Sequence, residues 1–224
     1  MVSADKVLKL LKNKNVIIVG NSVEILNYKK GEFIDSHDVV IRMGRGLPRT
    51  KIQKEAIGTK TDIWATGFLR AEQMAGRKEL IGVPKLLNRT RINLLSARML
   101  EATLDEEFHT MWTDNELMAI YEEFGYVNNE VLGRPSNGFI TLLWLIKKAW
   151  VWKSLTLIGF DFFAKKGPFK VGAAYPNSWH MPRNTVDEIP HNVPIEKEYA
   201  LEMSRNGIIK WEILSDLKEE ILDE

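Results

Sequence analysis

The sequence predicts an α/β fold: a single Rossmann-like domain over residues 1–224, with a mostly parallel central sheet and helices on both faces. Four consecutive β-branched residues, Val16 to Val19, suit a central strand that is covered on both sides. This strand and a second one, Val39–Met43, end in glycine turns about 25 residues apart, a spacing that fits one βαβ unit. The 224 residues are enough for one such domain and too few for two of usual size.

The first strand ends in Gly20-Asn21-Ser22, after which the chain turns helical. A small-residue turn between a strand and a helix leaves backbone N–H groups pointing outward, where they can bind a phosphate. Asn21 and Ser22 add side-chain donors, and either can instead cap the helix, so a purely structural turn is the alternative. The turn contains neither the G-x-G-x-x-G dinucleotide fingerprint nor a P-loop, which disfavours those two classes of site.

The composition is that of a folded, soluble protein, with 45% hydrophobic and 27% charged residues. The absence of cysteine excludes disulfides, thiolate metal sites and cysteine nucleophiles. Residues 1–15 contain no apolar run that fits a signal peptide or a membrane span, so we expect a cytoplasmic protein.

The net charge of +1 is unevenly distributed along the chain. Residues 1–100 contain 19 Lys and Arg against 9 Asp and Glu, whereas residues 101–224 contain 12 against 21. This asymmetry fits either ordinary solvated faces or a positive cleft for an anionic donor or acceptor, nucleic acid included.

The other elements of the first half follow from apolar periodicity. We expect a helix at 3–13, a basic loop at 45–60, a strand at 63–66, a helix at 68–80 and a strand at 92–96. Residues 101–130 carry an apolar stripe typical of one or two surface helices packed on the core. The alternative is that Trp112 or Tyr121, within that stripe, forms a subsite that binds the acceptor. In the segment that leads into the strand at 63–66, Thr59 and Thr61 either cap backbone groups or bind a donor phosphate.

The second half is organised around Arg134–Gly138, where Ser136 can cap the helix that follows. That helix, Phe139–Trp150, is apolar almost all round, which predicts that it is buried. The remaining predictions are a strand at 154–161, a long and therefore functional or mobile loop at 162–190, a helix from His191 through Met203, a strand at 208–213 and a final acidic helix.

Several motifs, in order, resemble those of the eukaryotic-type sialyltransferases, glycosyltransferase family 29. VGNS followed by IDSHDVVIRM resembles the large sialylmotif, and PSNG followed by a buried helix and a strand ending in GFD resembles the small one. His191 and Glu196, spaced H-x4-E, resemble the very short motif, and an aromatic segment ending at His180 stands near the third. The resemblance covers residues 16 to about 201 and implies a GT-A-like variant of the Rossmann-like fold.

The resemblance implies an enzyme that transfers a sugar from a nucleotide donor to an acceptor hydroxyl by metal-independent, inverting displacement. CMP-sialic acid is the donor that the resemblance favours, and a glycan or another hydroxyl compound is the acceptor. No cofactor is implied besides this co-substrate. In agreement, the sequence contains no Asp-x-Asp metal clamp and no cluster of His and Cys ligands.

The resemblance also assigns roles to individual residues. His191 is the general base that takes the acceptor proton, because imidazole titrates near neutral pH. His180 hydrogen-bonds the departing phosphate, and Glu196 orients His191 or its loop. The implied donor-binding residues are Gly20, Asn21, Ser22, Arg42, Gly44, Ser136, Asn137 and Gly138.

Three departures from the family pattern leave alternatives open. Gly44 replaces an asparagine that meets the nucleotide, Asn137 replaces Thr or Ser, and the two cysteines and the anchor of animal members are missing. The chain therefore resembles a soluble microbial or viral relative. One alternative is a relative that uses another donor, such as a UDP-sugar, and modifies a hydroxylated base in DNA. Another is a non-catalytic module that binds nucleotide or glycan.

Overall fold

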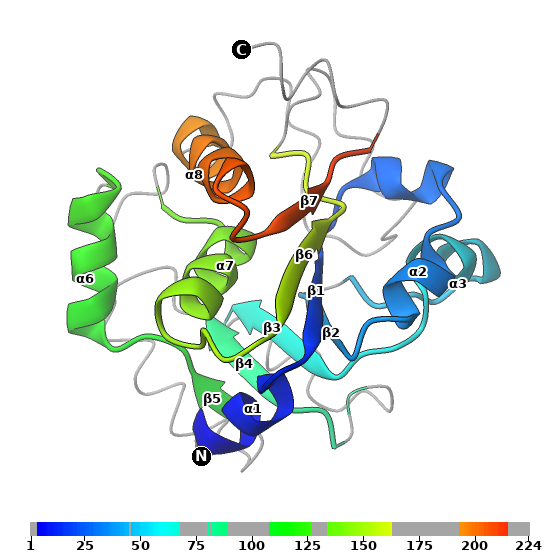
Figure 1. Cartoon of the computed structure of the whole chain (residues 1–224), viewed down its shortest axis with the longest axis horizontal. Coiled ribbons are helices and arrows are strands. Elements are labelled where there is room, and N and C mark those ends of the chain that lie inside the picture. Colours follow the sequence, from blue (N-terminus) through cyan, green and yellow to red (C-terminus); the bar gives the residue numbers. More distant parts are fainter. Residues whose placement is uncertain are drawn as a thin grey trace.

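A parallel β-sheet forms the centre of the molecule (Figure 1). The structure, a computed structural model, describes residues 4–44, 46–67, 80, 82–88, 108–126, 134–162 and 193–214. Within these residues the sheet has seven strands in the order β5-β4-β3-β2-β1-β6-β7, and every neighbouring pair is parallel. The strands are β1 Asn15–Val19, β2 Val39–Met43, β3 Ile63–Gly67, β4 Lys85–Asn88, β5 Phe108–Thr110, β6 Ser154–Ile158 and β7 Lys210–Glu212.

The predicted central strand is confirmed. β1 pairs with β2 on one side and with β6 on the other, so Val16 lies opposite both Val39 and Leu155. Its four apolar residues, 16–19, are at most 1% exposed. A strand covered on both faces needs apolar side chains at successive positions, which explains the unbroken β-branched run.

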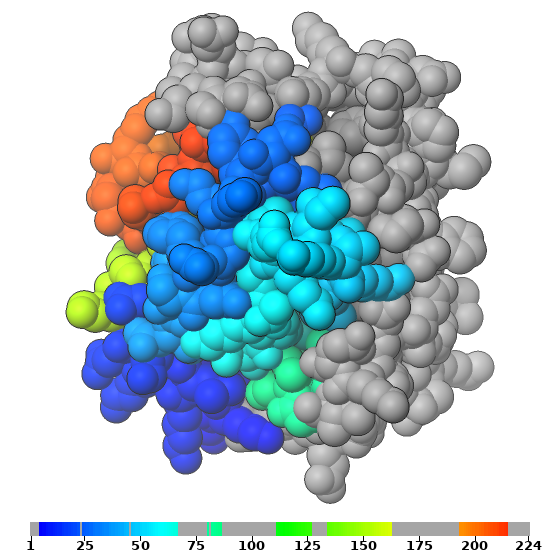
Figure 2. All heavy atoms as spheres, turned by 90° about the vertical axis from the view of Figure 1, so that its right-hand side faces the viewer, coloured from blue at the N-terminus to red at the C-terminus, as the bar shows by residue number. Residues whose placement is uncertain are grey.

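Helices cover both faces of the sheet. They are α1 Ala4–Leu11, the 3₁₀ helix η1 Val23–Asn27, α2 Gly31–Asp35, α3 Lys51–Ile57, α6 Asp114–Glu123, α7 Asn137–Lys147 and α8 Val193–Arg205. In Figure 1, α6, α7 and α8 lie to the left of the central strands and α2 and α3 to the right. Figure 2 views the α2–α3 side, where the blue and cyan residues form a continuous surface. The predicted α/β class, with a mostly parallel sheet, is confirmed.

Helix α7 is the buried helix that the sequence predicts between the small-residue turn and β6. Every residue from Phe139 to Ile146 is buried, and the helix packs against β3 and β4. Burying one such large apolar side chain stabilises the fold by about 1.5–3 kcal/mol. Two ion pairs fasten α7 to α6, from Lys147 to Glu123 and from Lys148 to Glu116.

The prediction of a continuous basic loop at 45–60 is wrong, because the segment contains α3. Thr50 Oγ1 accepts a hydrogen bond from Gln53 N, and the Gln53 side chain accepts one from Thr50 N. This capping box satisfies the orphan donors at the start of the helix. Gly58, with φ of +71°, follows the last helical residue.

Two further strands, β4 and β5, were not predicted. The helix expected at 68–80 (apart from Leu80), the strand at 92–96, the loop at 162–190 (apart from Phe162) and the final acidic helix lie outside the described residues. Within residues 101–130 the structure contains α6, which confirms one predicted surface helix. Trp112 and Tyr121 are each 4% exposed, so the apolar stripe at these positions belongs to the core.

Candidate active site

The carboxyl ends of β1 and β6 lie side by side where the strand order of the sheet reverses. From β1 the strands step outward through β2 to β5, and the chain then places β6 on the other side of β1. In open α/β sheets, ligands bind in the crevice at such a switch point. The turn Gly20–Ser22 directly follows β1, and the turn at Gly159 directly follows β6. The predicted donor turn therefore lies where this fold binds ligands.

Backbone hydrogen bonds hold the turn after β1 against the end of β6. Gly20 N donates to Ile158 O at 2.7 Å, and Ser22 N donates to Gly159 O at 3.0 Å. Ser22 is 5% exposed, and its Oγ accepts a hydrogen bond from Glu24 N at 3.3 Å. Ser22 therefore caps η1, a 3₁₀ helix of five residues, as the sequence allowed.

Asn21 connects this turn to the end of β2. Its Nδ2 donates to Met43 O at 3.3 Å. The next residue of β2's turn, Gly44, has φ of +51°, in the left-handed region that glycine and, less readily, asparagine adopt. Gly44 O accepts a hydrogen bond from Trp64 Nε1 at 2.7 Å, which fixes the peptide. Asn21 and Gly44 of the predicted donor set are thus brought to the same edge of the sheet.

The second predicted donor segment, Ser136–Gly138, forms the start of α7 and reaches the same edge. Ser136 is the N-cap, and its Oγ accepts a hydrogen bond from Phe139 N at 3.1 Å. A Cβ placed on Gly138 would lie 3.5 Å from Met43 Cε, so α7 begins against the end of β2. Both predicted donor segments, far apart in sequence, therefore meet at the switch point, and the positive end of the α7 dipole lies there too.

Glu196 lies behind the start of α7, in the first turn of α8. It is 1% exposed, and its Oε1 accepts hydrogen bonds from Ser136 N at 2.7 Å and from Tyr126 OH at 3.2 Å. Burial raises the pKa of Glu196 to about 7, and the hydrogen bonds from Ser136 and Tyr126 partly oppose this rise. Burial, reinforced by the Glu196 carboxylate, also raises the pKa of Tyr126. Glu196 thereby connects the α8 segment to the predicted nucleoside segment.

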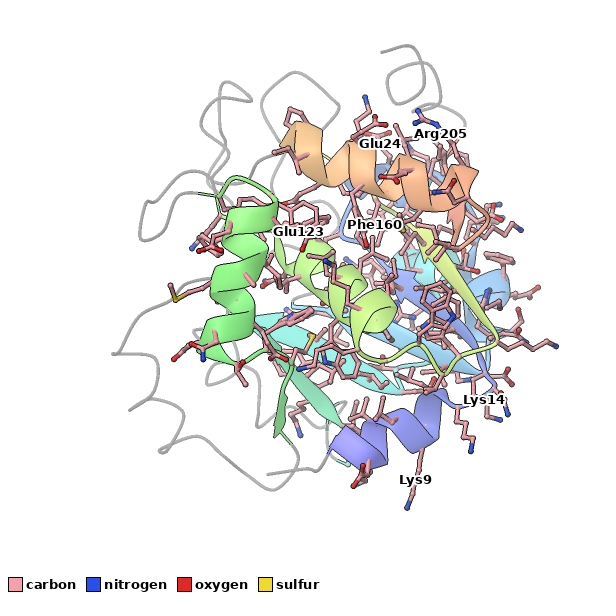
Figure 3. The ribbon with its side chains drawn as sticks, turned by 60° about the vertical axis from the view of Figure 1, so that its left-hand side comes forward. Lys9, Lys14, Glu24, Glu123, Phe160 and Arg205 are labelled. Carbon is pink, nitrogen blue, oxygen red and sulfur yellow. The ribbon has the colours of Figure 1, made fainter. Side chains whose placement is uncertain are left out.

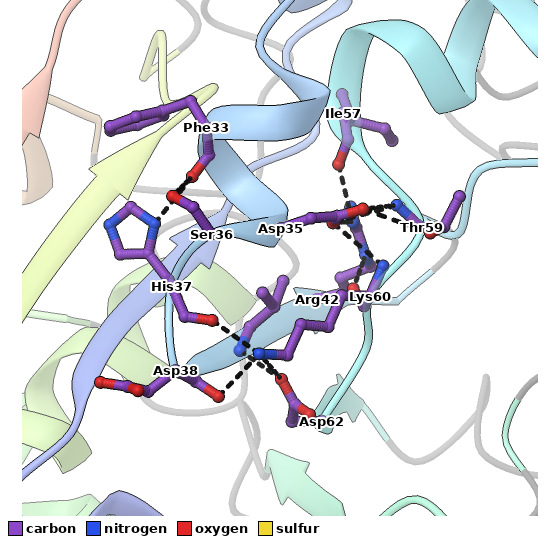
Figure 4. Close-up of polar contacts among 11 residues, drawn as sticks. Phe33, Asp35, Ser36, His37, Asp38, Arg42, Ile57, Thr59, Lys60 and Asp62 are labelled. Atoms are coloured by element: carbon purple, nitrogen blue, oxygen red, sulfur yellow. Dashed lines mark hydrogen bonds and ion pairs between the residues drawn. The ribbon is translucent and has the colours of Figure 1, made fainter.

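Arg42, also in the predicted donor set, is fully buried and contacts α2 and the loop after α3 (Figure 4). Its Nε donates to Lys60 O at 2.8 Å and its Nη2 to Ile57 O at 2.6 Å. The Asp35 carboxylate lies 3.8 Å from Nη2. These contacts fasten β2 to its covering helices. A direct contact between Arg42 and the donor stays a prediction.

The structure gives Thr59 a structural role. Thr59 N donates to Asp35 Oδ2 at 2.8 Å, and its hydroxyl donates to the same oxygen at 3.2 Å. This favours the interpretation that Thr59 caps a neighbouring group. The predicted base His191 and the predicted phosphate ligand His180 lie outside the described residues, and α8 begins two residues after His191.

Three residues at this edge were missed by the sequence analysis. Trp64 fixes the Gly44 peptide, Tyr126 binds Glu196, and Phe160 packs between the two donor segments. Phe160 belongs to the GFD strand end that resembles the small motif, a signal that could have drawn attention to it. Tyr126 stands 70 residues from Glu196 in the sequence, and no local pattern indicates their contact.

Among the described helices, none is long and apolar enough to span a bilayer. Within the same parts of the chain, His, Asp and Glu side chains do not gather in groups of three or more that could hold a metal ion.

Comparisons with known proteins show which fold and which family this chain shares. A mammalian sialyltransferase in complex with Gal-beta-1-3GalNAc-ortho-nitrophenol has a similar fold, with a TM-score of 0.56 and 15% identity over 94% of this chain and 73% of that chain. The sialyltransferase CstII from Campylobacter jejuni, in complex with the substrate analogue CMP-3FNeuAc, gives a TM-score of 0.52 and 17% identity over 88% and 78% of the two chains. Among curated proteins, sequence comparison finds no match. The model of glycosyltransferase family 29 matches residues 8–208, and the chain therefore belongs to this family of sialyltransferases.

Proposed function

We propose that this chain transfers sialic acid from CMP-sialic acid to an acceptor hydroxyl. The observation that carries the proposal is the meeting of Gly20–Ser22 and Ser136–Gly138 at the switch point of the sheet. The similarity to CstII, which was solved with CMP-3FNeuAc, supports a CMP-linked donor. The similarity to the mammalian enzyme in complex with Gal-beta-1-3GalNAc-ortho-nitrophenol supports a galactoside as acceptor.

In the proposed reaction, the acceptor oxygen attacks the anomeric carbon of the sugar while the bond from that carbon to the phosphate oxygen breaks. His191 takes the proton of the attacking hydroxyl, and CMP leaves with the electron pair of the broken bond. His180 donates a hydrogen bond to the departing phosphate. Attack from the face opposite the leaving group inverts the configuration. Protein donors stabilise the charge of the single phosphate, so the mechanism requires no metal.

The donor-binding residues divide into two groups in this proposal. Gly20, Asn21 and Ser22 hold the phosphate and the ribose, and Ser136, Asn137 and Gly138 hold the nucleoside. Glu196 is a positioning residue, because its hydrogen bond to Ser136 N fixes the start of α7 relative to the chain segment after His191. Gly44 lies beside the nucleotide. Arg42 supports β2 through its contacts with α2 and with the loop after α3.

Thermal unfolding in the presence of CMP, CDP, UMP, UDP and GDP tests the donor. A nucleotide at about 100 times its Kd stabilises the folded state by about 2.7 kcal/mol and raises Tm by several degrees. We expect CMP and CDP to raise Tm and the other nucleotides to leave it unchanged. A shift with UDP alone would contradict the cytidine donor and would favour a relative that uses a UDP-sugar, with Gly44 as the residue to examine.

Substitution of the predicted base separates an enzyme from a binding module. We expect His191→Ala to abolish transfer from CMP-sialic acid and to keep the Kd for CMP. A wild-type protein that binds CMP but transfers no sugar to any galactoside would favour the non-catalytic module. If the acceptor is instead a base in DNA, the protein will bind duplex DNA, and that binding will weaken steeply with added salt.

A further inference from the structure

Phe160 lies two residues beyond the end of β6 and is partly buried against the core (Figure 3). A Cβ placed on Gly20 would lie 2.9 Å from Phe160 Cδ2, and a Cβ placed on Gly138 would lie 2.7 Å from Phe160 Cε1. Cδ2 and Cε1 are para to each other on the ring. Gly20 and Gly138 therefore face opposite ends of one aromatic side chain, which fills the space between the two donor segments.

The ring also contacts a further aromatic side chain. Phe160 packs against Phe162, with ring centroids 5.8 Å apart, and Phe162 meets the ring of Trp211 in β7 edge-on at 5.1 Å. Neither glycine leaves room for a methyl group beside the ring, so the ring itself fills the space between them and does not need Phe162 to do so. The separation between Gly20 and Gly138 is consequently set by the size of the Phe160 ring.

We propose that Phe160 is a positioning residue that sets the distance between the phosphate-binding turn Gly20–Ser22 and the nucleoside-binding start of α7. This inference rests on the proposed function, because it takes both segments as parts of one donor site. A nucleotide that contacts both segments binds best at one separation. A smaller side chain at position 160 lets the two segments move relative to each other, and groups displaced by even about 1 Å bind and react less well.

Phe160→Leu and Phe162→Leu form a matched pair for the test. Both variants remove one ring from the same aromatic chain, but only Phe160 lies between Gly20 and Gly138. We expect Phe160→Leu to raise the Kd for CMP about tenfold, which corresponds to about 1.4 kcal/mol. Phe162→Leu should lower Tm about as much as Phe160→Leu does, because each substitution removes one ring. It should change the Kd for CMP by less than about twofold. Titration calorimetry measures Kd, and steady-state kinetics with CMP-sialic acid should show a larger effect of Phe160→Leu on KM than on kcat.

A double variant gives an independent test. The atoms nearest to a Cβ on Gly138 belong to the side chains of Phe160 and Met43, whereas a Cβ on Gly20 would lie 2.1 Å from the backbone oxygen of Gly159. A smaller side chain at position 160 can therefore make room at Gly138 but not at Gly20. We expect Gly138→Ala/Phe160→Leu to bind CMP no more weakly than the weaker of its two single variants. In Gly20→Ala/Phe160→Leu, by contrast, the losses of CMP affinity caused by the two single substitutions should add.

The outcomes separate this proposal from the proposed function. If the wild-type protein does not bind CMP, the proposed donor is wrong and Phe160 has no donor to position. If the wild type binds CMP but the two Leu variants change Kd equally, Phe160 is an ordinary core residue and only the present proposal falls. The comparison of Phe160→Leu with Phe162→Leu decides this even if Gly20→Ala fails to fold.

Discussion

Glu196 receives the hydrogen bonds of both Ser136 N and Tyr126 OH on the same oxygen, Oε1, and this determines which residue can replace it. Glutamine has an equivalent oxygen, so we expect Glu196→Gln to keep transfer activity within about threefold of the wild type. Glu196→Ala leaves the buried hydroxyl of Tyr126 and the partly buried N–H of Ser136 unpaired and should cost about 2–4 kcal/mol of stability. Activity assays and urea unfolding measure the two effects. Equal loss of activity in both variants would mean that the carboxyl group itself transfers a proton.

The raised pKa of Glu196 predicts how stability depends on pH. In the unfolded chain the carboxyl loses its proton near pH 4.5, whereas in the folded protein it keeps the proton until about pH 7. Between these values the folded state binds more protons, so stability falls as pH rises and levels off above pH 7. The fall amounts to about 3 kcal/mol. Between pH 5 and pH 8, urea unfolding should show a fall in stability that is larger in the wild type than in Glu196→Gln by most of this amount, because the difference between the two proteins cancels the other titrating groups.

Gly44 occupies a backbone conformation that limits its substitutes. At φ of +51°, asparagine is tolerated better than other side chains, and a β-branched residue is strained. We expect Gly44→Asn to lose less than about 1 kcal/mol of stability and Gly44→Val to lose more. Because related enzymes place asparagine beside the nucleotide, Gly44→Asn should also lower the Kd for CMP. An unchanged or higher Kd, measured by calorimetry, would indicate that glycine is an adaptation to a different donor.

At the scale of whole elements, the segment that resembles the large motif divides between two edges of the sheet. Its first part, Gly20–Ser22, lies at the carboxyl edge with the candidate site. Its second part, residues 34–38, lies at the amino edge, where β2 begins. There Lys60 Nζ donates to His37 O at 2.6 Å, and Asp38 Oδ2 accepts from Asn15 N at 2.8 Å. The contacts of the second part hold strands and loops together, and we expect it to take no part in the chemistry.

Asp35 provides the test of this division. Its carboxylate accepts hydrogen bonds from Thr59 N and Lys60 N and lies beside the buried Arg42. We expect Asp35→Ala to lose about 2–4 kcal/mol of stability, because donors and a buried cation lose their acceptor, while the Kd for CMP stays unchanged. Glu32→Ala removes the same charge from an exposed position of α2 and should change stability by less than about 0.5 kcal/mol. A weaker affinity for CMP in Asp35→Ala would show that the amino edge communicates with the site.

The elements also show what a sequence can and cannot predict here. β1, β2 and α7 were predictable because their apolar patterns are long and are set by local burial. α3 was not predicted, because its basic composition is typical of a loop. β4 was not predicted, because the strand has polar residues at both ends, Lys85 and Asn88. The turns at Gly20 and Gly44 were predictable because each directly follows a strand. The contacts of Glu196 and Phe160 were not, because they join residues from separate elements and no local pattern encodes such pairs.

At the scale of the whole molecule, the candidate site is assembled from distant parts of the chain. The first part, which carries the net positive charge, supplies β1 and β2 with the turns that follow them. The second part supplies α7, β6 and α8. Neither part contains the whole donor set, since Gly20 and Gly138 meet only across the ring of Phe160. We therefore expect donor binding to require the completed sheet.

A shortened chain tests how far the fold depends on the pairing of β6 with β1. A chain that ends at residue 153 keeps β1 to β5, α6 and α7 but loses β6, which pairs with β1 along its full length. The β1 strand, apolar on both faces, then becomes an exposed edge, which is a template for aggregation. We expect residues 1–153 to aggregate or to lack near-ultraviolet circular dichroism from their tryptophans, and to bind no CMP. A soluble monomer with cooperative unfolding would show instead that β1 to β5 fold independently and that β6 and β7 add to a preformed sheet.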